Sequence, residues 1–379
     1  MRVPAVLCLV MLTISLSMAQ TGEEYWLLVG TYSNEDNSNG IQVYRFDTKT
    51  GDARFESKST DVTNPSYLAT GADGTRVFAV SEMGGGKGAV NSFSFDPSSG
   101  VLSWLGSVTS AGDHPCYVSV SHDQKVVFVG NYSSGTLSAI RVGPDGTLDP
   151  AIQTIRHEGG SVNASRQDKP HVHAVVPSPE GRFLMVPDLG TDKVHIYAIN
   201  TSAGEALQPA GEAAITPGGG PRHLTFHPNG KYAYLIRELD AAVTVFDYKD
   251  GRLTEKQSVT LLDPGFRGKV GAADIHVSPD GKFLYGSNRG EANEITIYSI
   301  GRDGKLTYAG RQSTLGRTPR NFAIDPTGNF LLAANQDTND IVIFRRDRKT
   351  GLLKDTGKRI QVDRPVCLKF VRIRAGAGR

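Results

Sequence analysis

The segment from Gly218 to Glu238, GGGPRHLTFHPNGKYAYLIRE, gathers residue types that often do chemistry. Its glycine run could cradle a phosphate, and its two histidines, His223 and His227, could hold a metal ion. A phosphate-binding glycine loop stands between a strand and a helix, and no helical pattern follows this one. The residues PNG before Lys231 instead predict a tight β-turn. We therefore interpret the segment as a hairpin and His227, just before the turn, as a turn-capping residue.

The hairpin is one copy of a repeat. Similar hairpins begin at Pro65, Pro115, Val172, Pro221, Ala272 and Pro319, at intervals of 50, 57, 49, 51 and 47 residues. Each contains an alternating strand, a turn such as DG, PNG or PDG, and a second strand, and two further strand patterns follow it. Four antiparallel strands in roughly 50 residues are typical of a β-propeller blade.

The two chain ends complete one more unit. The stretches YWLLVGTYS, GIQVYRFD and ARFESKS near the N-terminus match strands two, three and four, and PVCLKF, Pro365–Phe370, matches strand one. Closing a ring in this way removes the open sheet edges of a linear array. The sequence therefore predicts an all-β fold: a single seven-bladed β-propeller over residues 20–379, with four-stranded antiparallel blades and a last blade built from both termini.

Composition and the N-terminus limit the partners and the compartment. The 41 basic and 39 acidic side chains leave a formal net charge of +2, which gives no footprint for nucleic acid. Arg2, an apolar run from Val3 to Leu16 and the small residues of SMA before Gln20 predict a signal peptide over residues 1–19. We expect an exported protein, periplasmic or secreted, and a cytoplasmic one if this segment is not a working signal. The run is too short to predict a membrane span.

Charged residues collect at one rim of the predicted ring. In a propeller, the start of strand one and the end of strand two lie at the same mouth of the central channel, where ligands bind. Aligning the repeats on their turns places there His173, Arg222, His223, Glu238, Asp274, Arg289, Arg320 and Gln336. They come mostly from consecutive repeats, which favours a substrate pocket. The alternative is a network of ion pairs between blades, Asp274 with Arg320 and Glu238 with Arg289.

Two long connections, residues 156–169 and 261–270, precede a first strand and should overhang the same mouth. Their basic residues either touch an anionic substrate or are solvated loop charges; these are Arg166, Lys169, Arg267 and Lys269.

Metal and covalent chemistry have little support. His171, His173 and His276 could contribute to a metal site, but zinc sites usually need three or four converging ligands. No GxSxG segment or Cys–His pair indicates a nucleophile. We expect Cys116 and Cys367, two blades apart, to be small buried strand residues. We therefore predict no metal and no cofactor.

Three segments carry a resemblance to a known family. GGGPRHLTFHPNGKYAYLIRE, GAADIHVSPDGKFLYGSNRG and TPRNFAIDPTGNFLLAANQ resemble signature segments of the lactonase family of seven-bladed propellers. That family includes one type of bacterial 6-phosphogluconolactonase and the fungal carboxy-cis,cis-muconate cyclase. The resemblance extends over essentially the whole mature chain. It implies a hydrolase that opens a sugar lactone, of the type that converts 6-phospho-D-glucono-1,5-lactone to 6-phosphogluconate. Its characteristic rim residues correspond here to His173, Arg222, Glu238 and Arg289, which we expect to be catalytic.

Lactone hydrolysis needs an activated water, a stabilised oxyanion and a proton for the leaving alkoxide. His173 or Glu238 could be the general base. Arg222 and Arg289 could stabilise the oxyanion and hold a carboxylate or phosphate of the substrate bidentately. We expect the remaining rim residues to bind substrate, namely His171, His223, Asp274, His276, Arg320 and Gln336. A non-catalytic binding scaffold and a lactonizing cyclase remain alternatives. Export would separate the protein from phosphorylated lactones of the cytoplasm, and the sequence does not indicate an oligomeric state.

Overall fold

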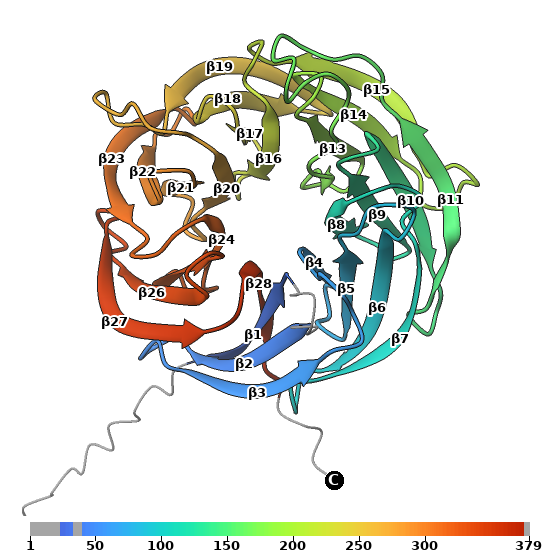
Figure 1. The fold of residues 1–379 in the computed structure, drawn as a ribbon, viewed down its shortest axis with the longest axis horizontal. Coiled ribbons are helices and arrows are strands. Elements are labelled where there is room, and N and C mark those ends of the chain that lie inside the picture. Colours follow the sequence, from blue (N-terminus) through green and yellow to red (C-terminus); the bar gives the residue numbers. More distant parts are fainter. Residues whose placement is uncertain (1–22, 33–39, 375–379) are drawn as a thin grey trace, which may run out of the picture.

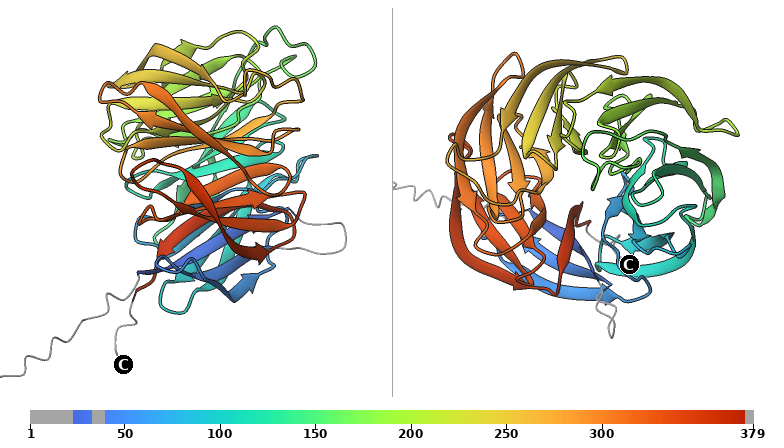
Figure 2. Two further views of the ribbon diagram at one scale, coloured as in Figure 1. Left: turned by 90° about the vertical axis from the view of Figure 1, so that its left-hand side faces the viewer. Right: turned by 45° about the horizontal axis from the view of Figure 1, so that its top comes forward.

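The computed structural model describes residues 23–32 and 40–374. Every regular element in these residues is a β-strand, and the strands form seven four-stranded antiparallel sheets arranged in a ring (Figure 1). Viewed from the side, the ring is a thick disc (Figure 2). The predicted seven-bladed propeller is confirmed. The predicted signal peptide lies outside the described residues, and within them no helix is long and apolar enough to cross a membrane.

We number the blades in chain order and give their strands from the innermost outward. The first blade is β4 (Leu68–Thr70), β5 (Arg76–Ser81), β6 (Ala89–Asp96) and β7 (Val101–Thr109). The second is β8 (Pro115–Val120), β9 (Val126–Asn131), β10 (Thr136–Val142) and β11 (Leu148–Arg156). The third is β12 (Val176–Pro177), β13 (Phe183–Asp188), β14 (Lys193–Ile199) and β15 (Leu207–Ala214). The fourth is β16 (Pro221–Phe226), β17 (Tyr232–Arg237), β18 (Ala242–Lys249) and β19 (Arg252–Thr260).

The fifth blade is β20 (Ala272–Val277), β21 (Phe283–Asn288), β22 (Glu294–Ile300) and β23 (Leu306–Ser313), and the sixth is β24 (Pro319–Ile324), β25 (Phe330–Asn335), β26 (Asp340–Arg346) and β27 (Leu353–Gln361). The seventh blade is β28 (Pro365–Arg372), β1 (Glu24–Thr31), β2 (Ile41–Asp47) and β3 (Ala53–Ser59). In this blade Tyr25 of β1 pairs with Arg372 of β28. Both termini therefore close the ring, as the sequence predicts.

The tight turns of the hairpins have the backbone that the sequence suggests. Gly230 in the fourth blade has φ of 71°, and Gln124 has φ of 59° at the corresponding turn of the second blade. His227 caps the turn, because its Nδ1 accepts the N–H of Asn229 at 3.1 Å. Its Nε2 donates to the carbonyl of Gly281 in the next blade at 2.9 Å. The interpretation of His227 as a capping residue is confirmed.

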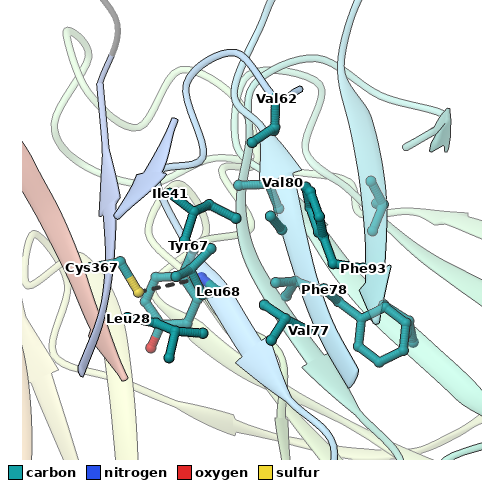
Figure 3. Close-up of a cluster of buried hydrophobic side chains, with 14 of the residues drawn as sticks. Leu28, Ile41, Val62, Tyr67, Leu68, Val77, Phe78, Val80, Phe93 and Cys367 are labelled. Carbon is teal, nitrogen blue, oxygen red and sulfur yellow. Dashed lines mark hydrogen bonds between the residues drawn. The ribbon is translucent and has the colours of Figure 1, made fainter. Parts of the chain in front are cut away.

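Apolar side chains fill the space between neighbouring blades. Figure 3 shows the cluster where the seventh blade meets the first, in which Leu28, Leu68 and Phe78 are at most 1% exposed. Cys367 lies in this cluster, and its Sγ accepts the backbone N–H of Leu68 at 3.3 Å. Cys116 and Cys367 are both buried and free, so the prediction of two buried strand cysteines is confirmed.

An extra residue near the start of the innermost strand shapes the central mouth. In β8, Pro115 pairs with Asn131 and Tyr117 with Gly130, so Cys116 has no partner. The same bulge leaves Arg222 unpaired in β16 and Arg320 unpaired in β24. Because a β-bulge turns a side chain away from the regular alternation, it redirects the residues of the predicted rim.

The third blade departs from the repeat. Its innermost strand, predicted to begin at Val172, is reduced to β12, and Val172 makes only an isolated bridge to Asp188. Pro187 on the facing strand has no N–H to donate to the ladder. Asp188 Oδ1 instead accepts the backbone N–H groups of His171, Gly190 and Thr191 at 2.8, 3.0 and 3.2 Å. The predicted full-length first strand was therefore wrong for this blade.

Candidate active site

A cavity of about 270 Å³ opens at the central mouth, and all seven blades contribute to it. Most of its residues stand at the start of an innermost strand or just after the second strand, where the rim alignment placed them. The exceptions are His173, which precedes the shortened β12, and Arg166, which comes from the long connection before the third blade. The lining residues are Tyr32, Glu82, Cys116, Tyr132, Arg166, His173, Glu238, Arg289 and Arg320.

Glu238 is the centre of the charged cluster. Its Oε1 accepts from Arg166 at 2.7 Å, and its Oε2 accepts from Arg222 Nε and Arg289 NH2, both at 3.0 Å. Burial alone would raise the pKa of Glu238, but Arg289 and Arg222 hold that pKa well below its ordinary value. The carboxylate is therefore ionised and weakly basic, and it holds three guanidinium groups in place.

His173 has the opposite electrostatic state. Its Nε2 lies 3.7 Å from Glu238 Oε2, and its side chain is 6% exposed. Burial, reinforced by the Arg222 charge, lowers the pKa of His173 well below its ordinary value. The imidazole is therefore neutral near pH 7 and offers a lone pair to a proton. Of the two candidate bases, His173 has a free lone pair near neutral pH, whereas the Glu238 carboxylate is held by arginines.

The cavity contains a cysteine–histidine contact, which the sequence did not indicate. Cys116 Sγ is 3.6 Å from His173 Nδ1 and equally close to the His173 carbonyl. Burial raises the pKa of the Cys116 thiol. A thiol kept protonated is a poor nucleophile, so the contact shapes the surroundings of His173 and does not form a thiolate pair.

The two arginines expected to stabilise an oxyanion occupy different places. Arg289 lines the cavity and its Nε donates to the carbonyl of Gly271 at 2.9 Å. Burial lowers the pKa of Arg289 to about 10, so it stays charged at neutral pH. Arg222 is only 1% exposed and is not part of the lining. It supports Glu238 from outside the cavity.

Arg222 connects the cavity to a second polar cluster, His223, Asp274 and His276. Since a guanidinium only donates, Arg222 NH1 donates to His223 Nε2 at 3.2 Å. His223 must then carry its proton on Nδ1, which donates to Asp274 Oδ1 at 2.9 Å. His276 Nε2 donates to the other carboxylate oxygen at 2.9 Å. Asp274 thus fixes the tautomer of the histidine that supports Arg222.

Of the residues expected to bind substrate, only one lines the cavity. Arg320 lines the cavity, whereas His171, His223, Asp274, His276 and Gln336 do not. His171 stacks on Tyr132, with ring centroids 4.4 Å apart, and its Nδ1 donates to the Tyr132 carbonyl at 3.0 Å. Of the two predicted ion pairs, Glu238 with Arg289 is formed. The Asp274–Arg320 pair was wrong, because His223 and His276 take the carboxylate of Asp274.

One of the two long connections reaches the cavity. Arg166 donates to Tyr132 Oη at 3.1 Å as well as to Glu238. Lys169 of the same connection is exposed. Arg267 and Lys269 are also exposed, and Arg267 donates to the carbonyls of its own loop. Residues 261–270 contribute nothing to the lining.

Three further lining residues were passed over in the sequence. Tyr32, Glu82 and Tyr132 follow the second strands of their blades, the position that also gives Glu238 and Arg289. The alignment on the turns already contained this signal. A selection by clustered charge gave too little weight to the two tyrosines and to Glu82, the one charged residue that the first blade places at the mouth.

The described residues hold one group with metal-like spacing, away from the cavity. His157, Asp188 and His195 each offer a ligand atom, all within 4.8 Å of one another. His157 Nδ1 already donates to Asp188 Oδ2 at 2.7 Å, and its Nε2 accepts from Tyr197 Oη at 3.0 Å. The centroids of the His157 and His195 rings lie 3.8 Å apart with the ring planes tilted by 36°, so the two imidazoles are in direct contact. His171, His173 and His276 do not form such a group.

Comparisons with known proteins agree with the fold and extend over nearly the whole chain. A 6-phosphogluconolactonase of Bacillus subtilis is 35% identical over 346 residues, 90% of this chain and 97% of that protein. A 6-phosphogluconolactonase of Formosa agariphila is 35% identical over 89% of this chain and 97% of its own. The structure of the periplasmic gluconolactonase of Pseudomonas aeruginosa is 40% identical, with a TM-score of 0.88, and covers 93% of this chain and 100% of that one.

The family model described as "Lactonase, 7-bladed beta-propeller" matches residues 26–370. That match includes all the cavity residues described above. The chain belongs to the lactonase family of seven-bladed β-propellers.

Proposed function

We propose that this protein hydrolyses a sugar lactone by 6-phosphogluconolactonase-type chemistry, opening the ring to a hydroxy acid. The observation that supports this best is the pairing of a neutral His173 with an ionised Glu238 in one arginine-lined cavity. A lactone has a carbonyl carbon for water to attack and a ring oxygen that must leave with a proton. The neutral His173 can move the proton that the water loses and the ring oxygen gains, and the arginines can stabilise the negative charge formed during the attack.

The groups in the cavity give each step a residue. His173 removes a proton from water as the oxygen attacks the carbonyl carbon, and the imidazolium formed is stabilised by Glu238 Oε2 at 3.7 Å. Arg289, which lines the cavity, stabilises the negative charge that develops on the carbonyl oxygen. The C–O bond of the ring then breaks, and the imidazolium returns its proton to the leaving alkoxide. The sum is one lactone and one water giving one hydroxy acid.

A pH-stat assay tests this function on purified protein with δ-gluconolactone and its 6-phosphate. We expect hydrolysis above the spontaneous rate, and loss of about 10²–10⁴-fold in kcat/KM in His173→Ala. His122, which is exposed on a turn far from the lining, provides the matched control His122→Ala with unchanged rate. Wild type equal to the buffer rate on both lactones would instead favour a binding scaffold.

We also propose that the protein is exported. The N-terminal pattern of Arg2, an apolar run and SMA supports this, as does the similarity to a protein named as a periplasmic gluconolactonase. Fusing residues 1–25 to a reporter that is active only outside the cytoplasm tests the proposal. A reporter that stays inactive in the cytoplasm would contradict it.

A further inference from the structure

Arg320 differs from the other arginines of the cavity because its donors are unused. Arg166 and Arg289 each donate to Glu238 and to a second acceptor. In the part of the chain that the structure describes, the Arg320 guanidinium makes no hydrogen bond. Its one ion pair, NH2 with Glu82 Oε2, is 3.9 Å long, and its side chain is 18% exposed. A largely desolvated cation with free donors is suited to an oxyanion.

The backbone holds Arg320 in this place at some cost. Arg320 is the bulged residue of β24, and Thr318, two residues before it, has φ of 58°. A β-branched residue rarely adopts the left-handed region, and such strain persists only where its surroundings enforce it. Asn293 Oδ1 accepts the Thr318 N–H at 2.8 Å, and the Thr318 carbonyl accepts the N–H of Gln336 at 3.0 Å. His114, Gly220 and Arg364 have the same left-handed backbone directly before their innermost strands, so this conformation belongs to the repeat and places Arg320 at the mouth.

The charges around Arg320 leave positive charge uncompensated. Arg166, Arg289 and Arg320 line the cavity against the two carboxylates of Glu82 and Glu238. Arg364 adds a further cation, since its guanidinium carbon and that of Arg320 both lie 5.4 Å from the centre of the Tyr32 ring. Opening the ring of a neutral sugar lactone gives no reason for cations beyond those held by Glu238. A second anionic group on the substrate gives one.

We propose that Arg320 binds an anionic group, phosphate or carboxylate, that the substrate carries away from its lactone carbonyl. Arg320 then selects anionic over neutral lactones, while Arg289 and His173 act on the ring itself. The inference rests on the proposed lactonase function and adds a subsite and a substrate class to it.

The test compares three lactones of one sugar series: δ-gluconolactone, its 6-phosphate, and a lactone with a carboxylate at the same end. We expect Arg320→Gln to lower kcat/KM for the preferred anionic lactone by about 10- to 100-fold, the loss of hydrogen bonds to a charged group. The neutral lactone should change by less than threefold. Arg320→Lys should restore part of the anionic rate, and Arg317→Gln, an exposed arginine of the same loop, should leave all three rates unchanged.

The outcomes separate the subsite from the chemistry. If Arg320→Gln lowers kcat/KM equally for neutral and anionic lactones, the subsite is overturned and the lactonase function stays intact. The same holds if the wild type does not prefer any anionic lactone. Whichever anionic lactone shows the selective loss identifies phosphate or carboxylate as the group bound. Thermal unfolding of each variant shows whether the fold survives, and Arg320→Lys serves if Arg320→Gln does not fold.

Calorimetric binding of gluconate and 6-phosphogluconate to wild type and Arg320→Gln adds a readout that needs no turnover. Tighter binding of the phosphorylated acid by wild type, lost in the variant, supports the proposal even if no lactone is hydrolysed. The proposal is contradicted if the wild type binds the two acids with equal affinity and shows no preference for anionic lactones in the hydrolysis assay.

Discussion

Two arginines of this propeller, the buried Arg346 and the partly buried Arg320, are used in opposite ways. Arg346, on the third strand of the sixth blade, has a side chain that is 0% exposed. Its Nε donates to Tyr285 Oη at 2.8 Å, NH1 to the Gly328 carbonyl at 3.0 Å, and NH2 to Asp280 Oδ1 at 3.1 Å. Each nitrogen of the guanidinium has an acceptor, and the acceptors come from the fifth and sixth blades.

Arg320 sits at the central mouth and leaves its donors free. The difference teaches how to separate structural from functional charge in a ring of similar blades. A cation whose donors are all satisfied within the protein stabilises the contact between blades, and removing it exposes an uncompensated partner. A cation held in place by the backbone but without acceptors awaits a ligand. Substitutions in the two regions should therefore change different measurements.

The largest effect on stability is expected at the satisfied arginine. Arg346→Met removes one partner of a buried pair and leaves Asp280 uncompensated, which costs about 3–5 kcal/mol of unfolding free energy. Activity per folded molecule should stay within twofold of wild type. Chemical denaturation measures the first quantity and a lactone assay on the folded protein the second. Arg345→Met, at the neighbouring exposed position, is the control and should change stability by less than about 0.5 kcal/mol.

A smaller loss of activity than in His173→Ala is expected on substitution of Asp274, which is not part of the cavity lining. Asp274→Asn replaces an acceptor of the His223 Nδ1 proton by a group that can donate, so the tautomer that accepts from Arg222 is no longer enforced. We expect kcat to fall by about 5- to 100-fold, the cost of an unmet buried hydrogen bond, with little change in KM.

Asp280→Asn provides the matching change beside Arg346, and it should lower stability while kcat stays near wild type. If Asp274→Asn keeps full activity and only unfolds more easily, the second polar cluster is structural, and the contrast between the two regions disappears.

Acid should destabilise the protein through its buried histidines. Burial lowers the pKa of His195 to about 4, of His223 to about 3, and of His173 well below 6.5. Between these values and 6.5 the unfolded chain binds protons that the folded protein does not. The unfolding free energy therefore falls as the pH drops below 6.5, by up to about 1.4 kcal/mol per pH unit for each histidine. Denaturation at pH 7.5, 6.5 and 5.5 should show a steepening loss, and a flat profile across this range would contradict it.

The sequence predicts the ring well because its signals are local. Each hairpin turn is encoded by a few residues, such as the PNG of the fourth blade, and the spacing of these turns sets the blades. Once the blades are aligned, the ends of their strands give Glu238, Arg289 and Arg320 as neighbours at one mouth. That part of the site follows from topology.

The remaining details depend on features without a local pattern. The bulge at Arg320 is one of them, because alternation along β24 alone does not reveal that this residue is left out of the strand register. Arg166 lies on a long connection with no periodicity, and its reach to Glu238 is a tertiary contact. The partners of Asp274 depend on side-chain geometry between blades. Because the sequence shows only charges, it favoured Arg320 as the partner, whereas His223 and His276 bind the carboxylate.

The smallest effect on stability is expected at an exposed ion pair between the third and fourth blades. Arg182 NH2 lies 2.8 Å from Asp250 Oδ1, a shorter contact than Arg320 makes with Glu82, but the two side chains are 61% and 67% exposed. Water and salt screen such a pair, so Arg182→Gln should change the unfolding free energy by less than about 1 kcal/mol, and less at high salt. Activity on neutral and anionic lactones should be unchanged. If Arg182→Gln lowers the unfolding free energy as much as Arg346→Met does, a short distance alone sets the strength of these ion pairs. Burial and satisfied donors would then no longer distinguish the structural Arg346 from Arg320 at the mouth.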